Sequence, residues 1–432
     1  MAEVILADLV HPYCSQNSRC LEERVRKLLS VISVGTSEPV YTIVQQHAHC
    51  AQELDESTLV QKCAELKTRL KFFSNNSLVA VLYSFKQAAD ELGVSSIHVM
   101  TCKSRLAELQ MCQKQLFTQT YSFTYSTVLD CTACPTTQLT STYTTLEYLK
   151  EQISSFLQHL PALRGDITIL KSPFISDFFV HGFTTRTGGI SYNSTLSSLN
   201  LFSSSRRRDS CAEVAENLRR LSVHAGFQPS QFHLVKVNHA SDVWVMNKPE
   251  PESYDAIVTN QAGVIIAAPG ADCMPLLFAD PVKKVIGVAH AGWKGTLMGV
   301  AMATVNAMMQ EFGSEFASVV AVIGPSVGSC CFTLEQDSAR KFQAIHPDCV
   351  RNPGSPTPYV DIRLATRILL ERGGILPEHI QDNTVTDSPN ITLCTSCHPD
   401  LFFSHVRDGI NFGTQIGFLG IKEPHELKQS DH

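Results

Sequence analysis

The sequence predicts an α/β protein of two domains, and three observations support this class. The chain has 432 residues, whereas a single domain typically has about 100–200. Helical and strand-like patterns alternate through the first 165 residues, which is typical of an α/β unit. Beyond them, short apolar strands are separated by glycine- and serine-rich loops. We therefore predict a smaller N-terminal α/β accessory domain over 1–165 and a mixed α/β catalytic domain over 166–432.

The elements of the N-terminal region follow from its periodicity. Apolar residues that recur at helical spacing predict helices, and short apolar runs between turn residues predict strands. Gly93 closes one predicted helix and Pro161 follows another, as is common at helix ends. We expect helices over 24–34, 54–73, 86–92, 104–117 and 145–159. We expect strands over 41–44, 78–85 and 97–101.

A change of pattern near residue 165 marks the expected domain boundary. The preceding segment LPALRGD has the composition of a connector. Downstream, we expect short strands over 264–268 and 284–289, where apolar residues run between turn signals. The catalytic domain is therefore expected to be rich in loops, with a polar tail over 422–432.

Composition limits the classes of function. The chain has 35 Lys and Arg against 41 Asp and Glu, a formal net charge of −6, which argues against a protein that mainly grips a nucleic-acid backbone. The longest apolar stretch, 264–278, is interrupted by Pro269, Gly270 and Asp272, so no membrane span is predicted. The N-terminus lacks the pattern of a secretory signal. We expect a cytoplasmic protein whose 15 cysteines are reduced thiols or metal ligands.

Two histidines and one cysteine are the main candidates for chemistry. His239, Cys273 and His290 each lie beside strand-like backbone that is punctuated by small residues. For the last two, an apolar strand adjoins the polar residue, which places the side chain at a strand end, where a sheet opens into a cleft. Two imidazoles and a thiolate suit zinc, and three protein ligands leave the fourth position open for water or substrate. Because each residue alone would more often be structural, the prediction requires all three to converge.

A series of ordered motifs resembles one known family. The motifs are HGFTTRTGGIS at 181–191, SSLNL at 197–201, AENLRRL at 215–221, GADCMPLLFAD at 270–280, AHAGWKGT at 289–296, IGPSVGSCCF at 323–332, CTSC at 394–397 and FFSHVRDG at 402–409. Together they resemble the motifs of the YfiH-like laccase-domain family. Their residues are most similar to those of animal members that have an extra N-terminal region. The resemblance implies a metal site at His239, Cys273 and His290. It also implies a purine nucleoside enzyme.

The resemblance implies two reactions that need different groups. One is phosphorolysis of adenosine, inosine, guanosine and methylthioadenosine, and the other is hydrolytic deamination of adenosine. Purine nucleosides and inorganic phosphate are thus the expected partners. Deamination needs a water activated at neutral pH, which zinc supplies by lowering its pKa from 15.7 to about 7.

Further residues are candidates for the acid, phosphate and purine sites. Asp272, next to Cys273, is the candidate acid that protonates the ring or the leaving ammonia. Trp293 is a candidate for stacking on the purine. Phosphorolysis also needs positive charge around the phosphate, and the candidates for this role are Arg186, Lys294 and Arg407.

Three other functions compete with this interpretation. A blue-copper site could recruit Met274, but a multicopper oxidase needs several His-x-His pairs and this chain has one, His47 and His49, so copper ranks below zinc. Alternatively, Cys273 is a thiolate nucleophile, activated by a histidine, that acts without metal on an amidine or ureido carbon such as that of citrulline. Residues 1–165, which show no catalytic constellation, could instead be a scaffold that docks on a protein partner.

The remaining cysteine motifs carry less chemistry. Residues 394–398 fit the haem-attachment pattern C-x-x-C-H, but the family resemblance implies no haem. A zinc ribbon would need a second C-x-x-C some 15–20 residues away, and the other such pair, Cys131 and Cys134, is far upstream. The adjacent Cys330 and Cys331 are expected to line or support the cleft.

Overall fold

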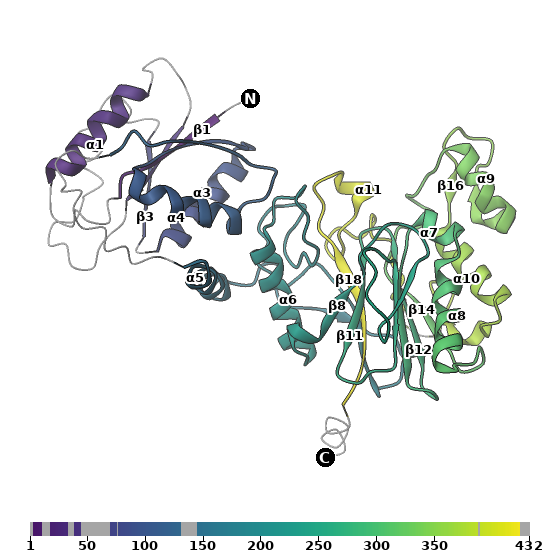
Figure 1. Ribbon diagram of the computed structural model, residues 1–432. Coiled ribbons are helices and arrows are strands. Elements are labelled where there is room, and N and C mark those ends of the chain that lie inside the picture. Colours follow the sequence, from purple (N-terminus) through teal and green to yellow (C-terminus); the bar gives the residue numbers. More distant parts are fainter. Residues whose placement is uncertain are drawn as a thin grey trace. The chain divides into compact units, whose positions relative to one another are not determined.

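The chain folds into two compact units (Figure 1). The computed structural model describes residues 3–10, 18–32, 39–44, 70–75, 77–130, 145–387 and 389–423. Their contacts place residues up to 160, together with 203–213, in the first unit. Residues 161–202 and those from 214 onward form the second. The first division between the two units falls after Leu160, whereas the sequence predicts a boundary near residue 165.

The first unit is built on a five-stranded sheet in the order β3-β2-β1-β4-β5, and every neighbouring pair of strands is parallel. Parallel neighbours require crossover connections, which explains the alternation of strands and helices in the sequence. The strands are β1 (Glu3–Asp8), β2 (Val40–Val44), β3 (Leu70–Ser74), β4 (Ser96–Met100) and β5 (Ser122–Ser126). The helices are α1 (Ser18–Val31), α3 (Leu78–Glu91), α4 (Lys103–Leu116) and α5 (Leu146–Gln158).

Two predictions for this unit are wrong. The run 78–85 is not a strand but the first half of α3, whose N-terminus is capped by the Ser77 hydroxyl accepting from the Ala80 N–H. An apolar run of this length suits either element, and α3 is buried around most of its circumference, which removes the helical periodicity from the sequence. Residues 70–73, predicted as the end of a helix, form β3 instead.

Other predictions agree with the structure or lie outside the described residues. Helices α1, α4 and α5 and strands β2 and β4 occupy the predicted regions, and Gly93 follows α3 with a φ of 66°. The remainder of the predicted 54–73 helix lies outside the described residues, as do the residues discussed for copper and for a zinc ribbon, His47, His49, Cys131 and Cys134.

The second unit contains two larger sheets and a short hairpin. The five-stranded sheet has the order β6 (Ile169–Leu170), β7 (Phe179–Thr184), β18 (Gln415–Ile421), β11 (Ile265–Gly270) and β8 (Phe232–Leu234). The six-stranded sheet has the order β17 (Ile380–Gln381), β14 (Val320–Ile323), β12 (Met274–Asp280), β13 (Val285–Ala291), β10 (Ala256–Thr259) and β9 (Val243–Val245). The hairpin pairs β15 (Val350–Arg351) with β16 (Tyr359–Val360).

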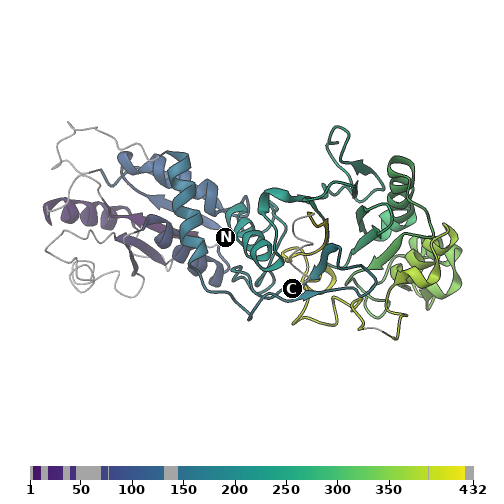
Figure 2. The same ribbon diagram turned by 90° about the horizontal axis from the view of Figure 1, so that it is seen from below.

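The two sheets pack face to face between helices (Figures 1 and 2). Ile266 of β11, Leu277 of β12 and Leu419 of β18 meet in the core between the sheets. The intervening residues of the same strands, such as Ile265 and Phe418, face outward and pack near α6, because successive side chains of a strand point to opposite faces. Burial on both faces explains the continuous apolar runs in the sequence. The helices are α6 (Cys211–Ala225), α7 (Trp293–Leu297), α8 (Val300–Phe312), α9 (Gln336–Ile345), α10 (Ile362–Arg372) and α11 (His405–Asp408).

None of the helices in the described part of the chain combines the length and the apolar character that crossing a bilayer requires.

Candidate metal centre

One end of the six-stranded sheet brings together residues that are far apart in the sequence. Strands β12 and β13 are antiparallel, with Pro275 opposite His290, so Cys273 just before β12 meets the end of β13. Strand β10 is also antiparallel to β13, with Ala256 opposite Ala289, which puts Asp255 at the same end. His239 reaches this place from the loop between β8 and β9. The antiparallel pairing therefore assembles the site.

The three predicted ligands converge. One ligand atom from each of His239, Cys273 and His290 lies within 4.8 Å of the others. The two imidazole rings are nearly perpendicular, with centroids 5.0 Å apart. His290 is 5% exposed, Cys273 is half-buried and His239 is exposed, so the group opens to solvent on the side of His239. We call these three residues the trio.

Asp255 forms hydrogen bonds with both histidines of the trio, a role that the sequence motifs do not predict. Its Oδ1 accepts from His290 Nδ1 at 2.8 Å and from the His239 backbone N–H at 3.2 Å. Its Oδ2 accepts from the N–H groups of Asn238 at 3.3 Å and Ala240 at 2.8 Å. A proton on Nδ1 leaves Nε2 of His290 as the free nitrogen, which is the usual arrangement for a metal-binding histidine. No motif marked Asp255, because its role depends on strand pairing.

The backbone around the trio has little freedom. His239 has a φ of 62° and Asp272 has a φ of 95°, values that residues other than glycine rarely adopt. Asp255 bonds to the backbone on both sides of His239 and at that residue itself, which stabilises the unusual conformation. A Cβ at Gly292 would lie 2.9 Å from the Cys273 sulfur. Glycine is therefore required there for the sulfur to keep its place.

When no metal is bound, Cys273 and His290 each favour the ionised form of the other. Burial alone would raise the pKa of Cys273, but the positive charge of His290 and hydrogen bonds from both histidines lower it. Burial alone would lower the pKa of His290, but the Cys273 thiolate and Asp255 raise it. Without metal, the favoured state is therefore a thiolate beside an imidazolium, held by a carboxylate.

The donor set fits zinc better than a blue-copper centre. Thiolate sulfur and imidazole nitrogen are zinc ligands, and the sulfur is already favoured as thiolate. A blue-copper site would add a weak axial ligand such as methionine. The Met274 sulfur instead accepts from the Thr366 hydroxyl of α10 at 3.7 Å and is fully buried in the core. The chemistry of the three donors therefore accommodates zinc at the trio.

Asp272 is anchored to the C-terminal segment. Its Oδ1 accepts from the Thr395 hydroxyl at 2.7 Å, and its Oδ2 accepts from the Val406 backbone N–H at 2.6 Å. Its backbone carbonyl accepts from the Val327 N–H at 3.0 Å. The carboxylate thus ties the turn before Cys273 to the segment of Thr395 and to α11.

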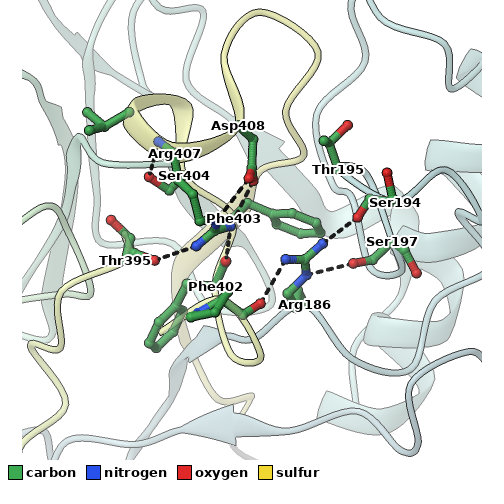
Figure 3. Close-up of polar contacts among 12 residues, drawn as sticks. Arg186, Ser194, Thr195, Ser197, Thr395, Phe402, Phe403, Ser404, Arg407 and Asp408 are labelled. Atoms are coloured by element: carbon green, nitrogen blue, oxygen red, sulfur yellow. Dashed lines mark hydrogen bonds and ion pairs between the residues drawn. The ribbon is translucent and has the colours of Figure 1, made fainter. Parts of the chain in front are cut away.

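Arg186 and Arg407 hold the loops on either side of Phe402 and Phe403 (Figure 3). Arg186 donates to the carbonyls of Ser194, Ser197 and Pro399, and its guanidinium lies 4.7 Å from the centroid of the Phe403 ring. Burial, together with the charges of Arg164 and Arg407, lowers the pKa of Arg186 to about 10. Arg407 pairs with Asp408 and donates to the carbonyls of Thr395 and Phe402.

Lys294 and Trp293 lie in the first turn of α7, directly after the strand end that carries His290. Lys294 is exposed, and its Nζ lies 5.4 Å from the centroid of the Trp293 ring. Among the described residues, no carboxylate forms an ion pair with it. Trp293 is partly buried against the core that backs the six-stranded sheet.

Comparison with known proteins agrees with the motifs. Residues 180–422 match the family described as multi-copper polyphenol oxidoreductase laccase. A mouse protein named purine nucleoside phosphorylase LACC1 is 50% identical over 434 residues, covering 98% of this chain and 100% of its own. A protein named adenosine deaminase RL5, from an unknown prokaryotic organism, is 32% identical over 174 residues, covering 39% of this chain and 62% of its own.

A solved structure matches the C-terminal region. The crystal structure of YlmD from Geobacillus stearothermophilus has a TM-score of 0.52 and 27% identity, covering 58% of this chain and 94% of its own. The C-terminal region therefore has the predicted YfiH-like fold, and the N-terminal part is an additional α/β region. Because the family pattern spans more than half of the chain and a relative matches nearly all of it, the chain belongs to the multi-copper polyphenol oxidoreductase laccase family.

Proposed function

We propose that the second unit is a zinc-dependent purine nucleoside enzyme, with the metal held by His239, Cys273 and His290. The observation that carries the proposal is the convergence of these three side chains at a sheet end, with one side open to solvent. The names of the relatives, purine nucleoside phosphorylase and adenosine deaminase, support the substrate class. The proposed reactions are phosphorolysis of adenosine, inosine, guanosine and methylthioadenosine, and hydrolytic deamination of adenosine.

The residues around the trio have distinct tasks in this proposal. When bound, zinc supplies Lewis-acid chemistry and activates water at neutral pH. Asp255 keeps the His290 proton on Nδ1 and fixes the loop of His239, so that both imidazoles face the same point. Asp272 positions Cys273 through its hydrogen bonds to Thr395 and Val406. In its second proposed role, as the general acid, Asp272 would donate a proton to the leaving group.

Phosphate needs positive charge near the nucleoside. In phosphorolysis a phosphate oxygen bonds to the ribose anomeric carbon, the bond to the purine nitrogen breaks, and the purine takes up a proton. Lys294 is the proposed phosphate partner with the most exposed charge, and Trp293 beside it is the proposed stacking surface. Arg186 and Arg407 contribute positive charge while their hydrogen bonds shape the neighbouring loops.

The decisive test replaces one ligand. His290→Ala should remove zinc from the trio and abolish both the release of purine base with phosphate and the release of ammonia from adenosine. His233→Ala, a histidine of β8 in the other sheet, is the matched control and should retain both activities. Thermal unfolding confirms that each variant is folded. Full turnover by a folded His290→Ala protein would refute the proposal.

One observation favours a second candidate, a thiol hydrolase or lyase that acts on an amidine or ureido carbon. Cys273, His290 and Asp255 are connected as nucleophile, base and orienting carboxylate, which is the arrangement of a catalytic triad. This candidate needs no metal, whereas the nucleoside enzyme does. Turnover of a ureido substrate such as citrulline that survives chelation, with covalent trapping at Cys273, would favour it.

A further inference from the structure

Four cysteines outside the trio form a second cluster, which we call the cysteine cluster. It consists of Cys330, Cys331, Cys394 and Cys397, whose sulfur atoms all lie within 4.8 Å of one another. The first two follow β14, and the last two precede α11. A zinc ribbon would pair the C-x-x-C motif at Cys394 and Cys397 with a second such motif. In the structure an adjacent pair of cysteines, more than 60 residues upstream in the chain, takes that place.

Local backbone structure turns the four sulfurs toward one point. The N–H groups of Cys331 and Phe332 both donate to the Gly328 carbonyl, so Cys330 and Cys331 lie in a tight turn rather than a strand. Neighbouring side chains of a strand would point to opposite faces, whereas a turn permits both to face the same way. Cys394 and Cys397 lie one turn apart, in the spacing typical of a metal-binding loop.

The distances suit a tetrahedral metal. Cys397 Sγ lies 3.5 Å from Cys330 Sγ and 3.4 Å from Cys331 Sγ, and no two of the four sulfurs are more than 4.8 Å apart. Four zinc–sulfur bonds of about 2.3 Å in a tetrahedron put the sulfurs about 3.8 Å apart, which is close to these two distances and below the limit of 4.8 Å. The Gly328 N–H also donates to Cys394 Sγ at 3.3 Å, a contact that stabilises thiolate ligands of metals.

A buried arginine supports negative charge at the cluster. Arg363 of α10 is 5% exposed and donates to the Ser326 carbonyl and hydroxyl and to the carbonyls of Thr392 and Leu393. A Cβ built at Gly328 would lie within 4 Å of Cys330, Cys394 and Arg363 Nη1, so the cation and the sulfurs share one small space. Arg363 thereby binds both cysteine-bearing segments and offsets part of the charge that four thiolates would carry.

We propose that the cysteine cluster binds a second zinc ion, with all four thiolates as ligands. Four protein ligands close the coordination sphere, so this site is structural, unlike the trio with its open position. The ion joins the loop after β14 to the segment before α11. Both segments bond to Asp272, through Val327 and Thr395, so the ion also stabilises the turn that carries Cys273. Zinc binding at the cysteine cluster does not depend on the proposed nucleoside reaction.

The test counts zinc in the full-length chain, purified under reducing conditions, by elemental mass spectrometry. Wild type should hold two zinc ions per chain. His290→Ala should keep one, and X-ray absorption at the zinc edge should then show sulfur neighbours alone, at about 2.3 Å. Cys394→Ser/Cys397→Ser should also keep one, now with nitrogen neighbours. Cys211→Ser, an exposed cysteine outside the cluster, should keep both.

Three results would overturn the proposal. One is a folded His290→Ala protein without zinc, and another is residual zinc in that variant with nitrogen ligands. The third is a disulfide between cysteines of the cluster in freshly purified wild type, seen as a loss of 2 Da for each bond in the intact mass. Because His290→Ala retains all four cysteines, its absorption spectrum decides the question even if the double-serine variant fails to fold.

Discussion

Replacement of Asp255 by asparagine should weaken the trio by disturbing both histidines at once. Each carboxylate oxygen accepts two hydrogen bonds, one oxygen from His290 and His239 and the other from Asn238 and Ala240. An asparagine amide has one accepting oxygen and one donating nitrogen. Whichever way the amide is turned, its nitrogen faces two N–H donors. The charge that favours the His290 Nδ1 proton is also lost.

The expected loss follows from the role of Asp255 behind the ligands. Removing a carboxylate that orients a metal-binding histidine typically lowers metal affinity about 10–100-fold, which corresponds to about 1.4–2.8 kcal/mol. Asp255 also holds the left-handed backbone at His239, so the upper half of this range is expected. Stability should fall as well, because the partly buried N–H groups of Asn238, His239 and Ala240 would lose acceptors.

The assay should report on the trio alone. Free zinc is set with a buffered chelator, and the fraction of Cys273 protected from iodoacetamide is measured on its own peptide. Asp280→Asn is the matched control, because Asp280 is equally buried at the opposite end of β12 and accepts from Val282 and Lys283. That control should leave the protection curve in place. If Asp255→Asn loses stability while its zinc midpoint matches wild type, the carboxylate does not act on the ligands.

Three more results are expected. Gly292→Ala places a Cβ against the Cys273 sulfur and should weaken zinc protection by about 10–100-fold; an unchanged midpoint would contradict the close packing. Without metal, Cys273 should react with an alkylating agent as a thiolate at pH values well below 8.5, the approximate pKa of an ordinary cysteine. His290→Ala should move the midpoint of the curve of alkylation rate against pH upward, because it removes a cation beside the thiolate. Lys86→Met should lower the unfolding free energy in urea by about 3–5 kcal/mol by leaving Glu213 buried without its cation, and Lys86→Met/Glu213→Leu should restore most of it.

Part of the convergence of the trio could be expected from the sequence, because two of its members carry a local signal. Cys273 and His290 adjoin apolar strands, and a strand end delivers its side chain to the edge of a sheet. The packing of the two sheets is also reflected in the sequence, because strands buried on both faces have continuous apolar runs. Residues 78–85 have the same kind of run, which predicts a strand, yet they belong to the buried helix α3. Hydrophobicity alone does not separate these cases.

Asp255 and the cysteine cluster could not be predicted, because both depend on pairing between distant segments. Asp255 meets His290 only through the register of β10 with β13. Cys330 and Cys331 meet the C-x-x-C motif through the bridge between Ser326 and Cys394. The regular spacings of known zinc-binding motifs do not include two adjacent cysteines that meet a C-x-x-C motif more than 60 residues away.

The register of the six-stranded sheet also explains why both candidate metal sites lie at the same end. Strand β12 pairs antiparallel with β13 on one side and with β14 on the other, so the start of β12 adjoins the ends of both neighbours. One neighbour brings His290 and the other leads into the loop of Cys330. Asp272, directly before Cys273, bonds to that loop and to the C-terminal segment. Because the strained residue before Cys273 depends on both segments, a closed metal site that fixes them also fixes the sulfur of the open one.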